Sequence, residues 1–337
     1  MNAVERLTFN LEKRIEHDYK GRTVAVVGGA GFLGSWICEA LVNVKATVHC
    51  IDNFSTGSKS NIFHLFDYDN FKFLQTDVGL EQFFMKGKVD YVLYLADRSS
   101  AAHIEKYPIQ IWKANVLGIY PFLGVARAHK AKFLYASSSL VYGKPEVNPV
   151  PESYNGRINP TNPADFYAEA KRSAEAYVIA NRAQRGLDVK IARIFDTYGP
   201  RMQADSIYAG SVAAFIEQSL RKQSLQLSGD GAQPSSLCFV SDMVEGILQF
   251  LAMDDGAGTV LNLGSSEAIQ MAEVASIINR LTSSSSRIFE GPEPASERPF
   301  YGLVPDITSA KELLGWTPRT KLEDGLRETI ERCPFNL

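Results

Sequence analysis

The stretch TVAVVGGAGFLG, residues 23–34, decides the fold of this chain. Its first five residues predict a short β-strand, and glycines follow at positions 28, 31 and 34. Glycines at this spacing permit a tight turn and a close approach of the backbone to a pyrophosphate group. The helix that they open offers free N–H groups and the positive end of its dipole. The stretch therefore predicts a dinucleotide-binding βα unit, and the alternative is a glycine turn with a purely structural role.

A carboxylate follows the next predicted strand. Asp52 comes directly after the run Thr47–Ile51, at the end of this strand, and stands 24 residues after Gly28. A carboxylate there accepts hydrogen bonds from the adenosine ribose hydroxyls and repels a 2′-phosphate, so it selects NAD over NADP. Asp77 follows a further strand, where it either hydrogen-bonds the adenine or caps a helix.

Short β-rich runs alternate with helical stretches along the chain, which predicts βαβ units and an α/β fold with a parallel sheet covered on both faces. The other runs are Phe71–Gln75, Tyr91–Leu95, Phe133–Ala136, Val189–Arg193 and Val260–Leu263. After about residue 197 we expect a smaller C-terminal lobe, with helices at Ser211–Arg221, Met243–Ala252 and Met271–Leu281.

The N-terminal residues predict an amphipathic helix over 3–18, because Val4, Leu7, Leu11 and Ile15 follow helical spacing. This helix packs on the body of the protein or on a partner subunit. We expect three parts, which are the N-terminal helix (1–20), a dinucleotide-binding domain (21–197 plus about 235–265) and a substrate lobe (198–234 plus 266–337).

Composition excludes several classes of protein. The 337 residues are 45% apolar with a net charge of −3, which fits a globular enzyme and gives no basic surface for nucleic acid. There is no apolar run long enough for a membrane span and no apolar segment typical of a secretion signal. Four dispersed cysteines fit reduced thiols in the cytoplasm, and the histidine spacing predicts no metal site.

Tyr167 and Lys171 are four residues apart in a good helix-forming segment, so they share one face. A nearby ammonium stabilises a tyrosine phenolate, which can then take the proton of an alcohol while a hydride leaves to NAD⁺. Ser137, Ser138 and Ser139 end another predicted strand, where hydroxyls face the ligand crevice or cap the following turn.

These motifs together resemble the extended short-chain dehydrogenase/reductases, in the NAD-dependent epimerase/dehydratase branch that acts on nucleotide sugars. Within that branch the chain is most similar to the UDP-glucuronate decarboxylases. The resemblance covers about residues 22–328 and implies a Rossmann fold, a doubly wound parallel sheet with a smaller α/β substrate lobe. The matching segments are GGAGFLG (28–34), DNFSTG (52–57), NVLG (115–118), ASSSLVYG (136–143), YAEAK (167–171), RIFDTYGPRM (193–202), GDGAQ (229–233), FVSDMVEGI (239–247), NLG (262–264) and PDITSAKELLGW (305–316).

The resemblance implies that Tyr167 is the base, that Lys171 is its electrostatic partner and a ribose contact, and that Ser138 helps to hold the reacting hydroxyl. It places the NAD contacts at Gly28, Gly31, Phe32, Leu33, Gly34, Asp52, Asn53, Ser55, Thr56, Gly57, Asp77, Val78, Leu95, Tyr167 and Lys171. We expect the substrate to contact Lys113, Ser138, Ser139, Leu140, Asp196, Arg201, Ser235 and Arg298.

Leu140 departs from the family pattern, because decarboxylases and dehydratases usually carry Glu two positions after the serine. Leucine moves no proton, and elimination of water needs an acid and a base besides the tyrosine, so a 4,6-dehydratase is disfavoured. A β-keto acid loses CO₂ readily, and epimerisation needs only hydride removal, rotation of the ketone and hydride return. We therefore expect epimerisation first, decarboxylation second and dehydration last.

Three further departures concern the diphosphate of the substrate. Asp196 replaces a usual Asn, Ser235 stands where Arg often follows the GDG loop, and residues 302–304 lack the Arg expected before PDI. A carboxylate repels a diphosphate, and loss of arginine removes a charge-assisted clamp. Arg201 and Arg298 are the candidate replacements.

Three functions stay open at this point. The first is an NAD-dependent epimerase or decarboxylase that transiently oxidises a ring hydroxyl, at C4, of a nucleotide sugar. The second keeps this redox chemistry but acts on a sugar, cyclitol or nucleoside-like alcohol without the usual diphosphate. The third is a regulatory protein that binds NAD without turnover, and the intact Tyr167, Lys171 and Ser138 argue against it.

The resemblance also implies a homodimer, formed through the helices that precede and carry the Tyr-Lys pair. Apolar positions within residues 109–127 fit either that interface or a buried core helix, namely Ile111, Trp112, Val116, Ile119 and Phe122.

Overall fold

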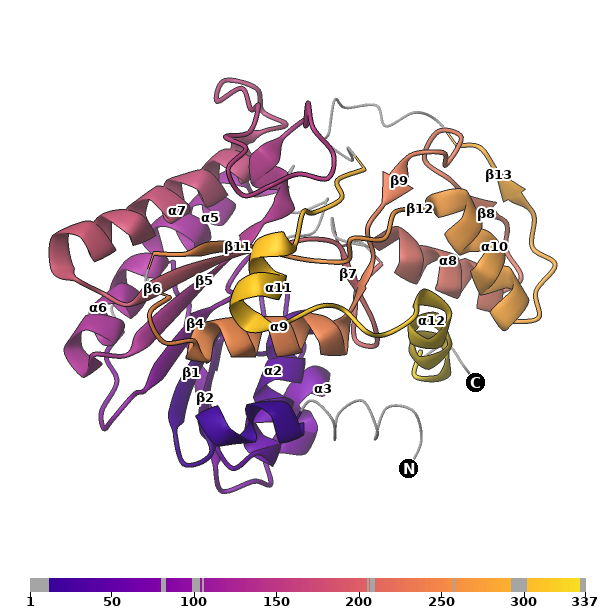
Figure 1. Ribbon diagram of the computed structural model, residues 1–337. Helices are drawn as coiled ribbons and strands as arrows, with labels where there is room; N and C mark the ends of the chain where they lie inside the picture. The colour runs from indigo at the N-terminus through magenta and orange to yellow at the C-terminus, as the bar shows by residue number, and fades with distance from the viewer. Residues whose placement is uncertain are drawn as a thin grey trace.

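The computed structural model describes residues 12–79, 83–98, 104, 106–204, 206, 210–256, 258–291 and 302–333. A seven-stranded sheet forms its centre, with helices on both faces and a group of smaller elements at one end (Figure 1). The expected α/β fold with a doubly wound parallel sheet is confirmed.

Every strand of the central sheet is parallel to its neighbours, in the order β11-β6-β5-β4-β1-β2-β3. All seven runs predicted from the sequence are strands, with ends that differ by a few residues. Their bounds are β1 Thr23–Val27, β2 Thr47–Asp52, β3 Phe71–Gln75, β4 Tyr91–Tyr94, β5 Lys132–Ser138, β6 Val189–Ile194 and β11 Val260–Leu263.

Alternating side chains of the strands bury into two separate cores. In β1, Val24 and Val26 pack on one face, whereas Ala25 and Val27 pack on the other. The first face is covered by α2 (Phe32–Asn43) and α9 (Val240–Ala252), and the second by α6 (Ile119–His129) and α7 (Phe166–Arg185). A sheet buried on both faces explains why central strands such as β1 and β4 are continuous apolar runs.

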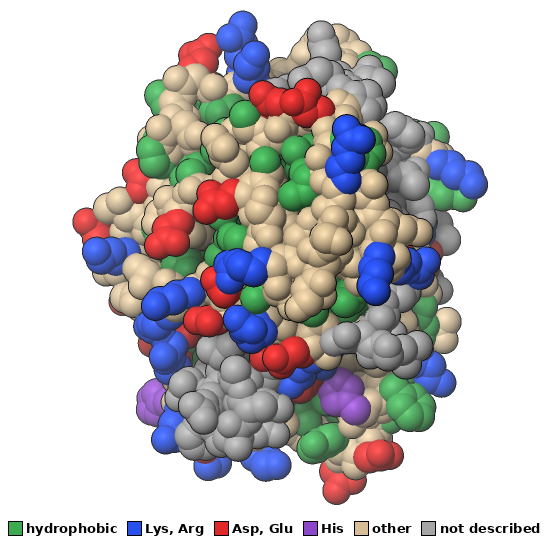
Figure 2. Space-filling model, turned by 90° about the vertical axis from the view of Figure 1, so that its right-hand side faces the viewer, with side chains coloured by type: hydrophobic (Ala, Val, Ile, Leu, Met, Phe, Trp, Pro, Cys, Tyr) green, Lys and Arg blue, Asp and Glu red, His purple; other side chains and the backbone are tan. Residues whose placement is uncertain are grey.

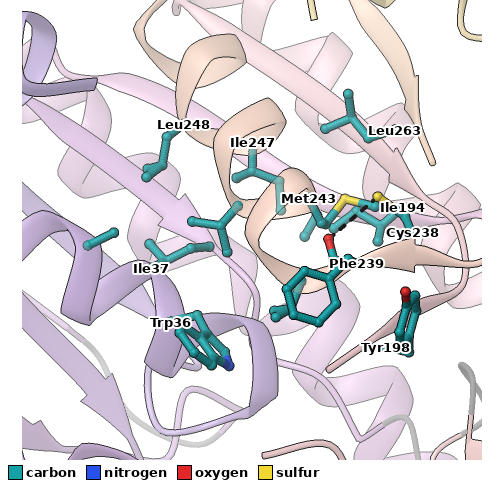
Figure 3. Close-up of a cluster of buried hydrophobic side chains, with 14 of the residues drawn as sticks. Trp36, Ile37, Ile194, Tyr198, Cys238, Phe239, Met243, Ile247, Leu248 and Leu263 are labelled. Atoms are coloured by element: carbon teal, nitrogen blue, oxygen red, sulfur yellow. Dashed lines mark hydrogen bonds between the residues drawn. The ribbon is translucent and has the colours of Figure 1, made fainter. Parts of the chain in front are cut away.

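The core between α2, α9 and the end of β6 continues into the smaller elements. Figure 3 shows Trp36 and Ile37 of α2 approaching Met243 and Ile247 of α9, with Phe239 beyond them. One apolar cluster thus joins the sheet to the C-terminal elements.

The smaller elements lie beside the carboxyl ends of the strands (Figure 1). Their helices are α8 (Gly210–Leu220), α10 (Met271–Leu281) and α12 (Leu322–Glu331), so the expected helices at 211–221 and 271–281 are present. Three pairs of two-residue strands accompany them, which are β7 (Thr197–Tyr198) with β10 (Cys238–Phe239), β9 (Pro234–Ser235) with β12 (Ile269–Gln270), and β8 (Leu225–Gln226) with β13 (Ile288–Phe289). By contrast α11 (Thr308–Leu314), although it falls in the range assigned to the lobe, contacts β11 and α9.

Short helical segments complete the description. They are α3 (Lys59–Ile62), η1 (Phe63–Leu65), α5 (Pro108–Trp112), the π-helical turn η2 (Lys113–Leu117) and the 3₁₀ turn η3 (Ser139–Tyr142). Residues 12–19 are helical and bury Ile15, while Val4, Leu7 and Leu11 of the expected N-terminal helix lie outside the described residues.

The strand order fixes where a ligand crevice forms. From β1 the chain adds β2 and β3 on one side of the sheet, and from β4 it adds β5, β6 and β11 on the other side. In open parallel sheets a ligand crevice forms where the strand order reverses in this way, beyond the carboxyl ends of the strands.

Where the chain is described, no helix is long and apolar enough to cross a membrane. Figure 2 shows basic and acidic side chains interspersed on the face that includes the smaller elements.

Candidate active site

A cavity of about 340 Å³ lies at the carboxyl ends of β1, β2, β4 and β5, and we call it the glycine-loop cavity. Most residues expected to bind the cofactor line it, namely Gly28, Gly31, Phe32, Leu33, Gly34, Asp52, Asn53, Ser55, Thr56, Asp77, Val78, Leu95 and Lys171. Gly57 is not part of this lining and packs on Ala30, whose backbone carbon would lie 2.9 Å from an added Cβ.

The glycine loop brings two segments of backbone together. Gly28 has a φ of +83°, and a Cβ on it would lie 2.7 Å from the backbone nitrogen of Ala96, just after β4. At the start of α2, the Ncap residue Gly31 has no side chain to bond the first turn. The first turn of α2 therefore faces the cavity with N–H groups suited to a pyrophosphate.

Asp52 lies at the end of β2 and is largely buried. Its carboxylate accepts hydrogen bonds from the backbone nitrogens of Ala30 at 2.9 Å and Phe54 at 2.8 Å. Burial raises the pKa of Asp52, and the backbone hydrogen bonds oppose this rise. Asp52 lines the cavity, and each carboxylate oxygen can accept a further hydrogen bond, which suits the ribose diol of an adenine dinucleotide.

Tyr167 and Lys171 lie in the first turns of α7. Lys171 lines the glycine-loop cavity, whereas Tyr167, also expected to bind the cofactor, is buried and is not part of that lining. Lys171 is 3% exposed, and its ammonium donates to the carbonyl oxygen of Ala136 at 3.0 Å. The same ammonium lies 5.9 Å from the centroid of the Tyr167 ring. The i, i+4 spacing thus places a phenol and a cation side by side, as the sequence indicates.

Asp97 was not singled out by sequence reasoning. The Tyr167 hydroxyl donates a hydrogen bond to Asp97 Oδ2, and Lys171 Nζ lies 3.2 Å from the same oxygen. Asp97 follows β4 as Asp52 ends β2, so the rule that identified Asp52 would also have found it. Asn115, on the π-helical turn, donates to Asp97 Oδ1 at 2.9 Å and was missed because the turn is not evident in the sequence.

The three serines after β5 differ in their contacts. Ser137 lines the cavity and donates to Glu175 at 2.5 Å, and Ser138 is fully buried and accepts from the backbone nitrogen of Leu140 at 3.0 Å. Ser139 is also buried. Leu140 packs in an apolar cluster that includes Tyr167.

The residues expected at the substrate are spread over several places. Lys113 lines the glycine-loop cavity. Ser235 donates to Asp196 Oδ2 at 3.2 Å, so these two departures from the family pattern lie together. Arg201 is outside the cavity lining, because its guanidinium bonds Glu39 and stacks on Trp36 of α2. Arg298 lies outside the described residues.

The helices of the expected dimer face are partly exposed. Ile111, Ile119 and Phe122 are buried in the protein itself. Four apolar side chains on the same segment are 38–65% exposed, namely Ile109, Trp112, Leu117 and Tyr120. Within the described ranges, no cluster of three or more His, Cys, Asp or Glu side chains is arranged to hold a metal ion.

Comparisons with known proteins agree with this arrangement. Residues 24–264 match the profile of the NAD dependent epimerase/dehydratase family. UDP-glucuronic acid decarboxylase 2 of Arabidopsis thaliana is 39% identical over 91% of this chain and 67% of its own length.

Two solved structures are similar over nearly the whole fold. A UDP-glucose 4-epimerase of Thermotoga maritima, solved with UDP-glucose, has a TM-score of 0.82 and 29% identity over 92% of this chain and 98% of its own. A UDP-glucuronic acid 4-epimerase of Bacillus cereus, in complex with UDP-glucuronic acid and NAD, has a TM-score of 0.79 and 25% identity over the same shares. Since relatives at 38–39% identity are named decarboxylases, the expected ranking of epimerisation ahead of decarboxylation is not supported.

Proposed function

Because the chain belongs to the NAD dependent epimerase/dehydratase family, we propose that it oxidises one ring hydroxyl of a nucleotide sugar transiently, at C4. NAD is the cofactor, and the residues that line the glycine-loop cavity fit it. The observation that carries the proposal is the Tyr167–Lys171 pair, in which Lys171 lines that cavity and Tyr167 bonds Asp97 of its lining.

The protein's own residues bind, orient and move protons in this mechanism. Bound NAD supplies the hydride acceptor and donor. The N–H groups at the start of α2 hold its pyrophosphate, and Asp52 accepts from the adenosine ribose. Tyr167 Oη takes the proton of the sugar hydroxyl and returns it, and Lys171 orients the nicotinamide ribose.

Decarboxylation of a UDP-uronic acid is the reaction that we propose first. The relatives at 38–39% identity over about nine tenths of this chain carry the name UDP-glucuronic acid decarboxylase. Oxidation at C4 makes the C6 carboxylate that of a β-keto acid, which loses CO₂ without a further base. The enolate that remains takes a proton at C5 from water, and the proton held by Tyr167 returns to O4 when the ketone is reduced again. Leu140 is compatible with this step because no proton has to pass through it.

C4 epimerisation is the second candidate. Leu140 packs with Ile104, Ile111 and Tyr167 in an apolar cluster, so η3 places an apolar side chain and not a carboxylate beside the Tyr167 ring. Removal and return of hydride need only the Tyr-Lys pair and the cofactor, which suits an enzyme that keeps all carbon atoms of its substrate.

The contact between Ser235 and Asp196 favours the alternative of a substrate without a diphosphate. A carboxylate in this place repels a diphosphate, and Ser235 offers one neutral hydroxyl where an arginine fork would give two charged donors. A thermal-shift titration with UDP separates the two cases, since ligand binding to the folded state raises the melting temperature.

One experiment tests the proposed reactions. The purified protein is incubated with NAD and UDP-glucuronic acid, and the products are separated and counted together with released CO₂. Decarboxylation gives equal amounts of CO₂ and a UDP-pentose, whereas epimerisation gives UDP-galacturonic acid and no CO₂. If neither product forms and UDP leaves the melting temperature unchanged, UDP-glucuronic acid is excluded as the substrate.

We also propose that the protein is a homodimer joined through the helices that precede and carry the Tyr-Lys pair, which are α5, η2, α6 and α7. The four exposed apolar side chains Ile109, Trp112, Leu117 and Tyr120 support this arrangement, because a cluster of large apolar side chains on one face marks an interaction site.

A further inference from the structure

Asp97 occupies a central place among the reactive groups. Its Oδ2 accepts from the Tyr167 hydroxyl and lies 3.2 Å from Lys171 Nζ, while its Oδ1 accepts from Asn115 Nδ2 at 2.9 Å and from the backbone nitrogen of Arg98 at 2.8 Å. The side chain of Asp97 is 11% exposed and lines the glycine-loop cavity. One carboxylate therefore contacts both members of the Tyr-Lys pair from the wall of the cavity.

The carboxylate is held in this position from several elements. Asn115 is fixed in turn by the Tyr135 hydroxyl, which donates to its Oδ1 at 3.2 Å, and by the carbonyl oxygen of Ile111, which accepts from its Nδ2 at 3.1 Å. The Thr56 hydroxyl donates to the backbone oxygen of Asp97 at 3.2 Å. Asp97 is thus positioned by groups that do not themselves react.

Other charged and titratable groups surround this centre. Tyr94 of β4 is buried, which raises its pKa, and the negative charge of Asp97 raises that pKa further. Asp77, Arg98 and Lys113 line the same cavity from other segments. Among the ion pairs of the described residues, the Asp97 carboxylate is paired with Lys171.

This arrangement changes what Lys171 does for Tyr167. An ammonium alone favours a phenolate, but here the ammonium is shared with a carboxylate that also accepts the phenolic proton. A phenolate and a carboxylate side by side would repel each other. In this geometry Tyr167 is held as a neutral phenol that donates to Asp97.

We propose that Asp97 is the proton acceptor behind Tyr167, which rests on the redox function proposed above. The proton of the substrate hydroxyl moves to Tyr167 Oη as the proton of Tyr167 moves to Asp97 Oδ2. The O–H electron pair of the substrate forms the carbonyl, and the C–H electron pair leaves as hydride to the nicotinamide. When hydride returns, both protons move back. Asp97 thus acts on the substrate only through Tyr167, and it holds the proton between the two hydride transfers.

The first test follows Tyr167 in the cofactor-free protein, so it does not depend on turnover. Asp97→Asn keeps the shape of the side chain and removes its charge. Phenolate absorbance is titrated in each protein, and the trace of the corresponding Tyr167→Phe protein is subtracted. We expect Tyr167 in Asp97→Asn to ionise at a pH lower by about 1–3, because Lys171 then acts on the phenol alone. The matched control is Asp254→Asn, which removes the carboxylate of a surface pair with Lys132 and should leave the titration unchanged.

The second test uses the NAD-loaded enzyme. Asp97→Asn should turn over about 100-fold more slowly at neutral pH and recover as the pH rises, because a preformed phenolate then replaces the relay. In Asp97→Ala, added formate should restore part of the activity by acting as the missing carboxylate. An unchanged phenolate titration together with a wild-type pH profile would overturn the proposal, as would failure of formate to raise the activity of Asp97→Ala.

These readouts separate the two proposals. If no nucleotide sugar is converted, the proposed function fails, yet the phenolate titration still decides whether Asp97 controls the proton of Tyr167. If the sugar is converted and the titration does not move, only the role of Asp97 fails.

Discussion

A Cβ atom on Gly34 would lie 2.1 Å from the carbonyl oxygen of Gly28. The first turn of α2 is therefore packed directly on the loop that follows β1, and neither partner in this contact is a flexible side chain. The glycine loop depends on this packing for its shape.

Gly34→Ala should destabilise the protein by about 1–3 kcal/mol, because the added methyl group displaces backbone in a close-packed site. NAD binding should be lost in the same variant. Denaturant titration and calorimetry measure the two effects. Gly124→Ala is the matched control, since no atom lies within 4 Å of the added Cβ inside α6, and it should stabilise by about 0.5–1 kcal/mol. Equal destabilisation by both substitutions would contradict this account.

Asp52→Asn should weaken NAD binding about tenfold to a hundredfold and narrow the preference for NAD over NADP, because the charged acceptor for the ribose hydroxyls is lost. Burial raises the pKa of Asp52, so acidification protonates it at a higher pH than an exposed aspartate. Wild-type affinity for NAD should fall over that range. The affinity of Asp52→Asn should stay flat there, and a parallel decline in both proteins would show that another group is responsible.

Tyr167→Phe should reduce turnover by about 100- to 10,000-fold, the range that a positioned acid–base group contributes. Its melting temperature should change little, since the ring stays packed with Ile111 and Leu140. Product formation and NAD binding are measured side by side. Tyr177→Phe, on the same helix α7 but partly buried against the second core, should retain full turnover. A Tyr167→Phe enzyme with wild-type turnover would remove tyrosine from the mechanism.

Leu117→Asp should convert a dimer into a monomer, because it places a charge among the exposed apolar side chains of η2 and α6. Light scattering coupled to size-exclusion chromatography gives the mass directly. Leu313→Asp on α11 is the control, as Leu313 is similarly exposed at 54% but lies away from that segment. A wild-type protein that is monomeric at all concentrations would end the proposal of a homodimer.

The sequence was most informative where local pattern and tertiary environment agree. The central strands could be predicted because they are rich in apolar and β-branched residues and are buried on both faces, as β1 illustrates. The edge strand β3 alternates apolar and polar residues and is only partly buried. The glycine loop and Asp52 followed from the same reasoning, since residues after parallel strands meet at one edge.

What escaped prediction depends on packing between distant segments. β7 and β10 are two residues long, which is too short for a periodic pattern in the sequence. They form strands because they pair with each other in the folded protein. The bond from Asn115 to Asp97 depends on the π-helical turn, whose extra residue has no mark in the sequence. Arg201 was expected at the substrate from its motif alone, but its proximity to Glu39 and Trp36 of α2 could not be inferred from the sequence.

The chain passes between the sheet and the smaller elements more than once. One connecting segment runs from β6 into β7, and another runs from β10 into α9. The two segments are held together because β7 and β10 pair in parallel. A lobe joined to a domain by one linker can rotate about it, whereas a lobe joined by two hydrogen-bonded segments resists rotation. Any closure over the cavity must therefore be a small, concerted movement, and hydrogen exchange at Tyr198 and Phe239 should be slow whether or not a ligand is bound.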